Sequence, residues 1–473
     1  MMPLTLASVL AGSGGRVLGA LDPATVFGAI ERDSRAIRPG DLFIAIRGEV
    51  HDGHAFVPMA AERGAAAALV SETWAAAHPD APLPLVVVDE PVAGLQRLAG
   101  WWRAQLPVTV VGVTGSIGKT STKEVVAAVL GRRFATYKNP GNLNNEIGLP
   151  LCLLDLGPET DVAVLEMGGA YAFGELALLA GIARQRVAVI VNIHPVHLER
   201  MGTIEAIAET KAELVDTLPP DGVAVLNGDD PRVRPMAARA PGRVVLYGRG
   251  PGNDVRAVDV APEGLDGTRF VLELGGERHP LRVAVVGDHA IDLALPAIAV
   301  GHALGMTVEE MRPGLADRSA QVRLLRVPGP RGATLIDDTY NAATPSVLSA
   351  LSLLAQLPAR RRVAVLGDMR ELGEVSEREH RVVGRRVAEV ADHLVTFGEM
   401  ARVIADEASR RVDGPPPTVT SFDLSERAEL VDFLREGIAE GDVVLLKGSR
   451  GLRMEEIVAA LRAGTDAPGT GAG

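Results

Sequence analysis

Short runs of β-branched and other apolar residues alternate along much of the chain with segments of helical periodicity. After Pro107, strands are predicted at VTVVGV (108–113), DVAVLEM (161–167), RVAVIVNI (186–193) and GVAVLNGDD (222–230), and KTSTKEVVAAVLGRR (119–133) predicts a helix. Strands that are apolar on both faces and alternate with helices are typical of a mostly parallel sheet covered on two sides. The central part of the chain is therefore predicted to be α/β.

A second alternating series begins near residue 325 and predicts another doubly wound, Rossmann-like sheet. Its predicted strands are GATLIDDT, RRVAVLGDM, HLVTFG and DVVLLKGS. Residues 1 to about 105 mix short strands and helices and end in an Ala-rich helical segment. A chain of 473 residues is expected to form two to four domains. We predict three, at 1–105, 106–322 and 323–464, and a Gly/Pro-rich tail at 465–473 whose composition predicts disorder.

Composition and charge narrow the possible classes of function. The formal net charge is −12 and aromatic residues make up 3% of the chain, so a nucleic-acid partner is not expected. Cys152 is the single cysteine of the sequence and lies in an apolar run, which predicts a buried thiol and a reducing compartment such as the cytoplasm. The first residues lack the features of a signal peptide and no apolar run approaches 18 residues, so membrane insertion is not expected.

The stretch VVGVTGSIGKTST (110–122) places a glycine-rich loop between a predicted strand and a predicted helix. Gly118, Lys119 and Thr120 fit the end of the phosphate-loop pattern G-x-x-x-x-G-K-[ST], but Val113 occupies the position of its first glycine. Backbone N–H groups at a helix start favour anions, a lysine there reaches terminal phosphates and a threonine holds Mg²⁺. Gly115 still permits close approach of the backbone to a ligand. The position therefore favours a phosphate loop with shifted glycines.

Other polar clusters have ordinary structural interpretations when each is taken alone. The Asn-rich run 139–145 predicts a loop. Glu166 ends a predicted strand beside the phosphate loop, where a carboxylate suits Mg²⁺ but equally suits solvent. The position of Lys211 in the sequence predicts a solvated residue on an amphipathic helix. Asp337 and Asp338 read as a turn after a strand.

Taken together, these motifs resemble those of the Mur ligases, ATP-dependent amide-forming enzymes of peptidoglycan precursor synthesis. Besides TGSIGKT, the matching stretches are DSRAIRPGDLFIAIRGEVHDGHAF (33–56), GNLNNEIGLPL (141–151), NIHPVHLERMGTIEAIAETKAE (192–213), LIDDTYNAATPS (335–346), GDMRELGEVSEREH (367–380) and KGSRGLRME (447–455). The resemblance spans about residues 33–457. It implies an N-terminal domain that binds the UDP-substrate, a central phosphate-loop domain that binds ATP, and a C-terminal Rossmann-like domain.

The last two stretches resemble the branch that joins D-alanyl-D-alanine to UDP-N-acetylmuramoyl-tripeptide through an acyl phosphate. The resemblance implies ATP and Mg²⁺ as cofactors, and a CO₂-derived carbamate on Lys211, which would turn a cation into a bidentate anion. It also implies a cytoplasmic monomer. The implied catalytic residues are Lys119, Glu166, His197 and Lys211, and the implied metal ligands are Thr120, Glu166, His197 and carbamylated Lys211.

The resemblance further implies two sets of binding residues. The nucleotide set is Thr114, Gly115, Ser116, Gly118, Lys119, Thr120, Ser121, His289, Arg323, Asp338, Tyr340 and Asn341. The substrate set is Ser34, Arg35, Asp52, Gly53, His54, Asn142, Asn144, Asn145 and Glu146. His194 does not match the family pattern and is given no role.

The sequence departs from the family pattern at two places. Ala290 and Leu293 stand where the family has asparagines of its adenine site, and Val322 replaces a glycine before the third domain. These changes predict a relaxed nucleobase preference. Three alternatives stay open: a sister ligase that adds a diamino acid, whose usual D-N-P-[RA] motif is missing from the sequence; a nucleotide-binding paralogue without catalysis; and a polyglutamate-type ligase acting on a folate, which would not need a UDP-binding domain.

Overall fold

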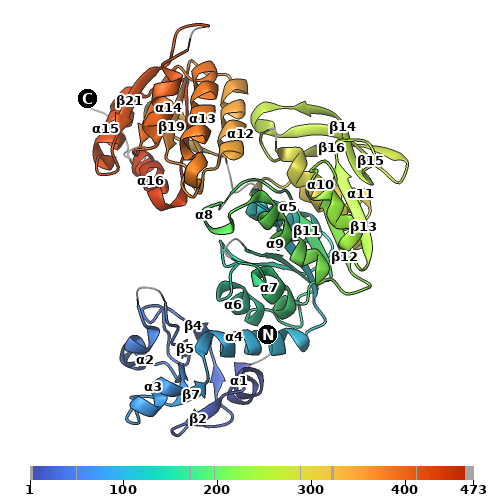
Figure 1. The fold of residues 1–473 in the computed structure, drawn as a ribbon, viewed down its shortest axis with the longest axis vertical. Coiled ribbons are helices and arrows are strands. Elements are labelled where there is room, and N and C mark those ends of the chain that lie inside the picture. The colour runs from blue at the N-terminus through green and yellow to red at the C-terminus, as the bar shows by residue number, and fades with distance from the viewer. Residues whose placement is uncertain are drawn as a thin grey trace, which may run out of the picture.

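The computed structural model describes residues 4–48, 51–169, 172–196, 198–287, 289–320, 324–411 and 413–463. They form three α/β domains that follow one another along the long axis of the molecule, from blue through green and yellow to red (Figure 1). The predicted fold class is confirmed. The tail predicted to be disordered, 465–473, lies outside the described residues.

The first domain contains a five-stranded sheet in the order β2-β7-β6-β5-β4, in which β2 is antiparallel to β7 and the other neighbours are parallel. A separate antiparallel pair joins β1 to β3. The strands are β1 Leu4–Thr5, β2 Arg16–Leu18, β3 Val26–Phe27, β4 Ile30–Glu31, β5 Leu42–Ile44, β6 Ala67–Ser71 and β7 Leu85–Val88. The helices are α1 Leu6–Ser13, α2 Val57–Glu62, α3 Glu72–Ala77 and α4 Pro91–Ala104.

Helix α4 ties the first domain to the second. Trp102 is buried and its indole N–H donates to the Leu156 carbonyl at 3.0 Å. Arg103 is also buried, and its guanidinium donates to three backbone carbonyls, of which that of Ala183 ends helix α7 (Glu175–Ala183). Because buried donors need partners, these bonds fix the direction in which the chain enters the central sheet.

The central domain contains a nine-stranded sheet in the order β16-β15-β14-β13-β12-β11-β8-β10-β9. Its strands are β8 Thr109–Thr114, β9 Thr136–Lys138, β10 Val162–Glu166, β11 Val187–Ile190, β12 Val223–Asn227, β13 Arg243–Gly248, β14 Val255–Pro262, β15 Thr268–Leu274 and β16 Glu277–Val283. Its helices are α5 Lys119–Leu130, α6 Gly148–Leu154, α7 Glu175–Ala183, α8 Leu198–Met201, α9 Ile204–Asp216, α10 Ala290–Ala303 and α11 Val308–Leu315. From β8 to β14 every pair of neighbouring strands is parallel, and β15 and β16 add an antiparallel edge next to β14.

Both faces of the parallel part are covered, as its continuous apolar runs predict. Val110 belongs to the core on one face of β8, and Val111 belongs to the core on the other. Burial on both sides explains why these strands lack an alternating polar face. The antiparallel edge is not predicted by the apolar runs, because β14 to β16 alternate buried and exposed residues instead.

The third domain contains a six-stranded sheet in the order β17-β18-β22-β19-β20-β21, with β17 antiparallel to β18 and the other neighbours parallel. Its strands are β17 Leu325–Pro328, β18 Thr334–Asp337, β19 Arg361–Gly367, β20 His393–Phe397, β21 Thr418–Phe422 and β22 Asp442–Lys447. Its helices are α12 Thr344–Gln356, α13 Ser376–Val390, α14 Ala401–Ala408, α15 Arg427–Gly437 and α16 Glu455–Ala463. Two apolar cores lie on the two faces of this sheet.

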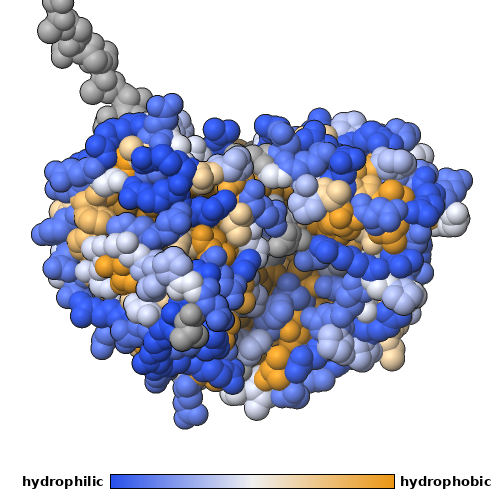
Figure 2. Space-filling model, turned by 90° about the horizontal axis from the view of Figure 1, so that it is seen from above, coloured by the Kyte–Doolittle hydropathy of each residue, from blue (hydrophilic) through white to orange (hydrophobic). Residues whose placement is uncertain are grey.

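The surface seen from above is mainly hydrophilic, and it is hollowed between two lobes where apolar side chains become visible (Figure 2). No helix among the described residues is both long enough and apolar enough to cross a lipid bilayer. The single cysteine, Cys152, is buried as predicted.

Candidate active site

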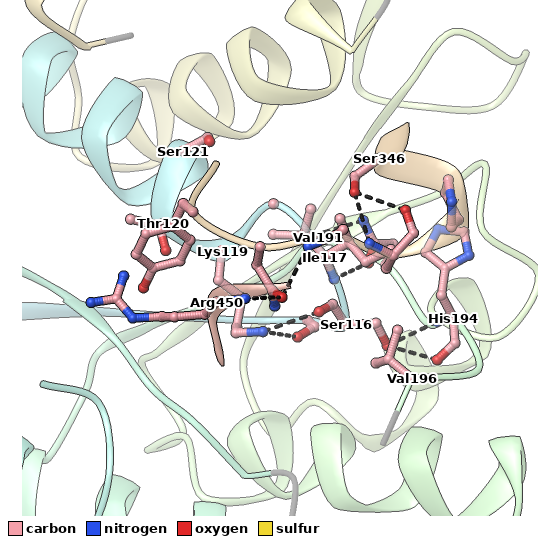
Figure 3. A pocket seen from close by; sticks show the side chains of 18 of the residues that line it. Ser116, Ile117, Lys119, Thr120, Ser121, Val191, His194, Val196, Ser346 and Arg450 are labelled. Atoms are coloured by element: carbon pink, nitrogen blue, oxygen red, sulfur yellow. Dashed lines mark hydrogen bonds between the residues drawn. The ribbon is translucent and has the colours of Figure 1, made fainter. Parts of the chain in front are cut away.

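A cavity of about 840 Å³ lies between the central and third domains. Its central-domain wall is formed by loops that follow β8, β10 and β11, and its other wall by loops that follow β18, β19 and β22. These are the carboxyl ends of neighbouring parallel strands in two sheets, the place where open α/β sheets bind ligands. Side chains that the sequence separates by more than three hundred residues, such as Ser116 and Arg450, meet there (Figure 3).

The glycine-rich loop between β8 and α5 has the conformation of an anion-binding turn despite its shifted glycines. Gly115 has φ +152° and Gly118 has φ +83°, backbone angles that residues with a Cβ rarely adopt. Gly118 caps α5, so the helix begins at Lys119 with its first N–H groups at the cavity. A Cβ at Gly115 would lie 3.0 Å from the Cβ of Val191, which shows how closely the loop packs on β11's continuation.

The loop after β11 braces the glycine-rich loop. Asn192 accepts from the Ile117 N–H at 2.9 Å through Oδ1 and donates to the Ile117 carbonyl at 3.0 Å through Nδ2. The Ser116 hydroxyl donates to the His194 carbonyl at 3.0 Å and accepts from the His194 N–H at 2.9 Å. Sequence reasoning overlooked Asn192, although it begins the motif NIHPVH and ends the run of a buried strand.

Lys119 curls back over this loop, and its Nζ donates to the carbonyls of Gly115 at 2.9 Å and Ser116 at 3.1 Å (Figure 3). Thr120 and Ser121 line the same cavity. Thr114 lies behind the loop instead: it is fully buried, its hydroxyl donates to the Met167 carbonyl at 3.0 Å, and it is not part of the cavity wall.

Glu166 ends β10 at the cavity with one carboxylate oxygen paired and one unpaired. Its Oε1 accepts from Asn144 Nδ2 at 2.7 Å, whereas Oε2 is buried and has no hydrogen-bond partner among the described residues. Asn139 clamps the backbone of Glu166, accepting from its N–H at 2.8 Å and donating to its carbonyl at 3.2 Å. A buried oxygen without a partner is costly unless a cation or donor binds it. The donor set therefore fits a hard cation such as Mg²⁺.

Lys211 is buried, contrary to the expectation from its position on an amphipathic helix. Helix α9 packs with this residue facing the cavity, and its side chain keeps 3% of its accessible surface. The Lys211 Nζ donates to the Gly169 carbonyl. Burial, reinforced by the positive charge of Lys119, lowers the pKa of Lys211 to about 7. A substantial fraction of this amine is therefore neutral near neutral pH.

A second buried lysine, Lys123, was not singled out in the sequence. It lies one helical turn after Lys119 on α5, and its Nζ donates to the Asn139 carbonyl at 2.6 Å and to the Gly141 carbonyl at 3.4 Å. Its Nζ is also 3.4 Å from Glu124 Oε1. Lys123 thus anchors the Asn-rich loop that holds Glu166 from behind.

The third-domain wall carries a compact polar cluster at the ends of β18 and β22. Lys447 is buried, and its Nζ donates to Asp338 Oδ2 at 2.5 Å and to the Asn341 carbonyl at 2.9 Å. The guanidinium of Arg450 lies over the ring of Tyr340, with its central carbon 4.6 Å from the ring centroid. Across the domain boundary, His289 Nδ1 is 3.2 Å from Ser349 Oγ on α12.

The other residues predicted from the family pattern fall into three groups. Asn142, Asn144 and Asn145 line the cavity, whereas Glu146 does not, and its carbonyl accepts from Gln96 on α4. The first-domain set lies away from the cavity. His197 and Arg323 lie outside the described residues.

Within the first-domain set, His54 is buried and paired on both sides. Its Nδ1 is 2.6 Å from Asp52 Oδ1, and its Nε2 accepts from the Ser71 N–H at 3.1 Å. A Cβ at Gly53 would come within 2.5 Å of a backbone oxygen, so glycine is required there. Ser34 is buried, whereas Arg35 is exposed and pairs with the neighbouring Asp33.

Three family profiles match the chain, which are the Mur ligase family catalytic domain at residues 27–100, the Mur ligase middle domain at 113–301 and the Mur ligase glutamate ligase domain at 322–450. The UDP-N-acetylmuramoyl-tripeptide--D-alanyl-D-alanine ligase of Bacillus subtilis is 35% identical over 439 residues, covering 92% of this chain and 93% of that protein.

Two solved structures extend the comparison to the fold. A crystal structure of MurF from Acinetobacter baumannii has a TM-score of 0.87 at 30% identity and covers 98% of this chain and 99% of that one. MurF ligase from Thermotoga maritima, in complex with ADP, has a TM-score of 0.74 at 29% identity and covers 92% of this chain and 97% of that one. Since sequence similarity and fold agree over more than nine-tenths of its length, this chain belongs to the Mur ligase family.

Proposed function

We propose that this protein is an ATP-dependent ligase that joins D-alanyl-D-alanine to UDP-N-acetylmuramoyl-tripeptide and releases ADP and phosphate. The observation that carries the proposal is that Lys119, Glu166 and Lys211, from three separate elements, line one cavity that faces the third domain. These three side chains together suit phosphoryl transfer to a carboxylate. The choice of substrates follows the printed names of relatives that match along nearly the whole chain.

The reaction needs an activated carboxylate, because a free carboxylate has no good leaving group. In the proposed first step, the terminal carboxylate of the tripeptide attacks the γ-phosphorus of ATP and forms an acyl phosphate. In the second step, the dipeptide amine attacks the acyl carbon, and phosphate leaves from the tetrahedral intermediate. Phosphoryl transfer depends on positioning and charge neutralisation more than on covalent catalysis by the protein.

The residues of the glycine-rich loop take the nucleotide role in this proposal. The N–H groups at the start of α5 bind phosphate oxygens, and Lys119 leaves the carbonyls of Gly115 and Ser116 to reach the terminal phosphates. Ser116, Gly118, Thr120 and Ser121 complete the wall on this side. Asp338, Tyr340 and Asn341 close it from the third domain, and His289 closes it from the start of α10. The family pattern gives Arg323 the same nucleotide role.

Mg²⁺ would be held by Thr120 and by the unpaired oxygen of Glu166, together with His197 and a carbamate on Lys211. When bound, Mg²⁺ supplies positive charge to the phosphoryl group in transit. The lowered pKa of Lys211 supports the carbamate, because only a neutral amine attacks CO₂. The amine nitrogen forms a bond to carbon and loses a proton, which leaves an anion where a buried cation stood.

The first domain would hold the UDP end of UDP-N-acetylmuramoyl-tripeptide through Ser34, Arg35 and the segment 52–54. The peptide end would lie nearer the cavity, held by the loop that contains Asn142, Asn144, Asn145 and Glu146. Because one chain supplies the whole cavity, a monomer suffices. The single buried cysteine suits the cytoplasm, where we place the reaction. The retained Lys119, Glu166 and Lys211 count against a paralogue without catalysis.

The test is phosphate release from ATP and Mg²⁺ in the presence of UDP-N-acetylmuramoyl-tripeptide, with and without D-alanyl-D-alanine. We expect release that depends on the dipeptide, with a pentapeptide product identified by its mass. Single amino acids should give no product in place of D-alanyl-D-alanine. Lysine and diaminopimelate should also give none when UDP-N-acetylmuramoyl-dipeptide replaces the tripeptide substrate. Release with a diamino acid instead would assign the chain to the sister branch, and no release with any amine would overturn the ligase proposal.

A further inference from the structure

Two arginine side chains of the third domain line the cavity without an acidic partner. Arg370 lies in the loop that follows β19, and Arg450 lies in the loop that follows β22, the neighbouring parallel strand. Both side chains are exposed to the cavity, and Arg450 lines the same cavity as Lys119, from the third-domain side (Figure 3). Among the described residues, neither guanidinium pairs with a carboxylate.

Many other arginines of the third domain are paired with carboxylates. Arg381, Arg386 and Arg402 each have a carboxylate oxygen within 2.8 Å. The one lysine that lines the cavity from the same domain, Lys447, is neutralised by Asp338 at 2.5 Å. In a chain with 60 acidic and 48 basic residues, two unpaired guanidiniums on one wall of a cavity have the character of an anion-binding site.

The protein holds both loops in place by other contacts. The backbone N–H of Arg370 donates to the Ser449 hydroxyl at 2.8 Å, which links the two loops. The Arg370 guanidinium lies over Gly451, where a Cβ would come within 2.8 Å of its Nη1. The residue after Arg370, Glu371, has φ +64°, a left-handed conformation that a non-glycine residue adopts only when its surroundings impose it.

Arg450 is oriented by an aromatic ring rather than by a carboxylate. Its guanidinium carbon lies 4.6 Å from the centroid of the Tyr340 ring, which is the geometry of a cation–π contact. Its backbone N–H points to Asn341 Oδ1 at 3.4 Å. A stacked guanidinium keeps its N–H donors in a fixed plane and free at their edge, which suits bidentate binding of a carboxylate.

We infer that Arg370 and Arg450 bind the terminal carboxylate of the incoming dipeptide, an inference that rests on the proposed function. The other anions of the reaction, the triphosphate and the tripeptide carboxylate, belong beside Lys119 and Glu166 on the central-domain wall. The dipeptide amine must reach the acyl carbon at that wall. An extended dipeptide spans roughly 7 Å, so its carboxylate points away from the reacting centre and toward the third domain. The arginine pair is the cationic feature available there.

The inference assigns a selection rule to these residues. An incoming dipeptide with a free terminal carboxylate gains charge-assisted hydrogen bonds from the two arginines. A dipeptide with a terminal amide instead leaves the two guanidiniums facing a neutral group. Charge-assisted bonds contribute about 1.5–3 kcal/mol, which corresponds to roughly ten- to a hundredfold in affinity. The pair would therefore determine the Michaelis constant for the dipeptide and leave that for ATP unchanged.

The test compares D-alanyl-D-alanine with D-alanyl-D-alaninamide in the wild type and in Arg370→Gln and Arg450→Gln. In the wild type we expect kcat/KM to be roughly ten- to a hundredfold lower for the amide. Each variant should raise KM for the dipeptide by a similar factor, leave KM for ATP within about twofold, and discriminate less between acid and amide.

Two further variants separate charge from position. Gly451→Ala changes no charge but places a methyl group against the Arg370 guanidinium, so it should also raise KM for the dipeptide. Arg402→Gln removes an exposed arginine that is paired with Asp423 at 2.8 Å, and it should change neither Michaelis constant.

The outcomes distinguish this inference from the proposed function. Dipeptide-dependent phosphate release by the wild type, combined with equal use of acid and amide, would overturn the carboxylate site and leave the ligase intact. A rise in KM for ATP instead of the dipeptide would reassign the pair to the phosphates. Absence of any dipeptide-dependent release by the wild type would instead count against the ligase itself.

Discussion

Replacing Lys211 with methionine should make the protein more stable at neutral pH, although it should abolish the reaction. Burial lowers the pKa of this amine from 10.5 to about 7. One pKa unit corresponds to about 1.4 kcal/mol, so burying this amine costs the folded state about 5 kcal/mol relative to the unfolded chain at pH 7 and below. Methionine has a similar length and no charge. It forfeits the hydrogen bond to the Gly169 carbonyl, which costs about 1–3 kcal/mol.

The net gain for Lys211→Met is therefore about 2–4 kcal/mol at pH 7. Because the folded pKa is the lower one, the unfolded state binds more protons between pH 7 and 10.5, and wild-type stability rises with pH in that window. The advantage of the variant should shrink by about 1.4 kcal/mol for each pH unit above 7 and be gone at about pH 8.5–10. Below pH 7 the advantage should be constant.

The assay is urea unfolding between pH 6.5 and 9.5, about the window given above, in buffer freed of CO₂ and without nucleotide. Tryptophan fluorescence, to which the buried Trp102 contributes, reports on the core that α9 shares with α4. Lys123→Met is the matched control, because Lys123 is equally buried but donates to the Asn139 carbonyl at 2.6 Å and lies 3.4 Å from Glu124. We expect that control to lose about 3–5 kcal/mol at every pH tested. A loss of stability in Lys211→Met at pH 7, or a difference from wild type that does not change with pH, would refute the reasoning.

Four further outcomes follow from the same cavity. In CO₂-depleted buffer, wild-type turnover should be low and recover with bicarbonate, and more CO₂ should be needed as the pH drops below the Lys211 pKa of about 7, whereas Lys211→Ala should be inactive with or without bicarbonate. Glu166→Gln should keep its bond with Asn144 but bind Mn²⁺ with ATP at least about tenfold more weakly, as measured by electron paramagnetic resonance; unchanged binding would exclude Glu166 as a ligand. Lys119→Met should lower kcat by roughly a hundred- to a thousandfold with circular dichroism unchanged, and a smaller loss would remove this lysine from the transferring phosphate. GTP should support turnover within about tenfold of ATP, because Leu293 offers no hydrogen bond to a base; a strict preference for ATP would contradict this.

Much of the architecture follows from local pattern alone. Val110 and Val111 pack into cores on opposite faces of β8, so a strand in this position must be apolar at consecutive residues, and that run is legible in the sequence. The glycine-rich loop is equally local, because the positive φ values at Gly115 and Gly118 belong to a turn only a few residues long. The antiparallel edge formed by β14 to β16 was missed because its residues alternate in burial and carry charges on the outer face.

The chemistry of individual side chains depended on contacts that no local pattern contains. On helix α9 a lysine among glutamates looks solvated, yet the packing of that helix turns Lys211 inward, and burial then lowers its pKa. Asn144 engages Glu166, 22 residues away, and so leaves one carboxylate oxygen without a partner. Arg370 and Arg450 are brought together because β19 and β22 are neighbours in the sheet, although β20 and β21 lie between them in the sequence. The sequence by itself determined the elements, the phosphate loop and the family, since these depend on short-range periodicity and motif. Which side chains are buried, charged, paired or left unpaired was decided only by the tertiary structure, since those properties arise from neighbours that are distant along the chain.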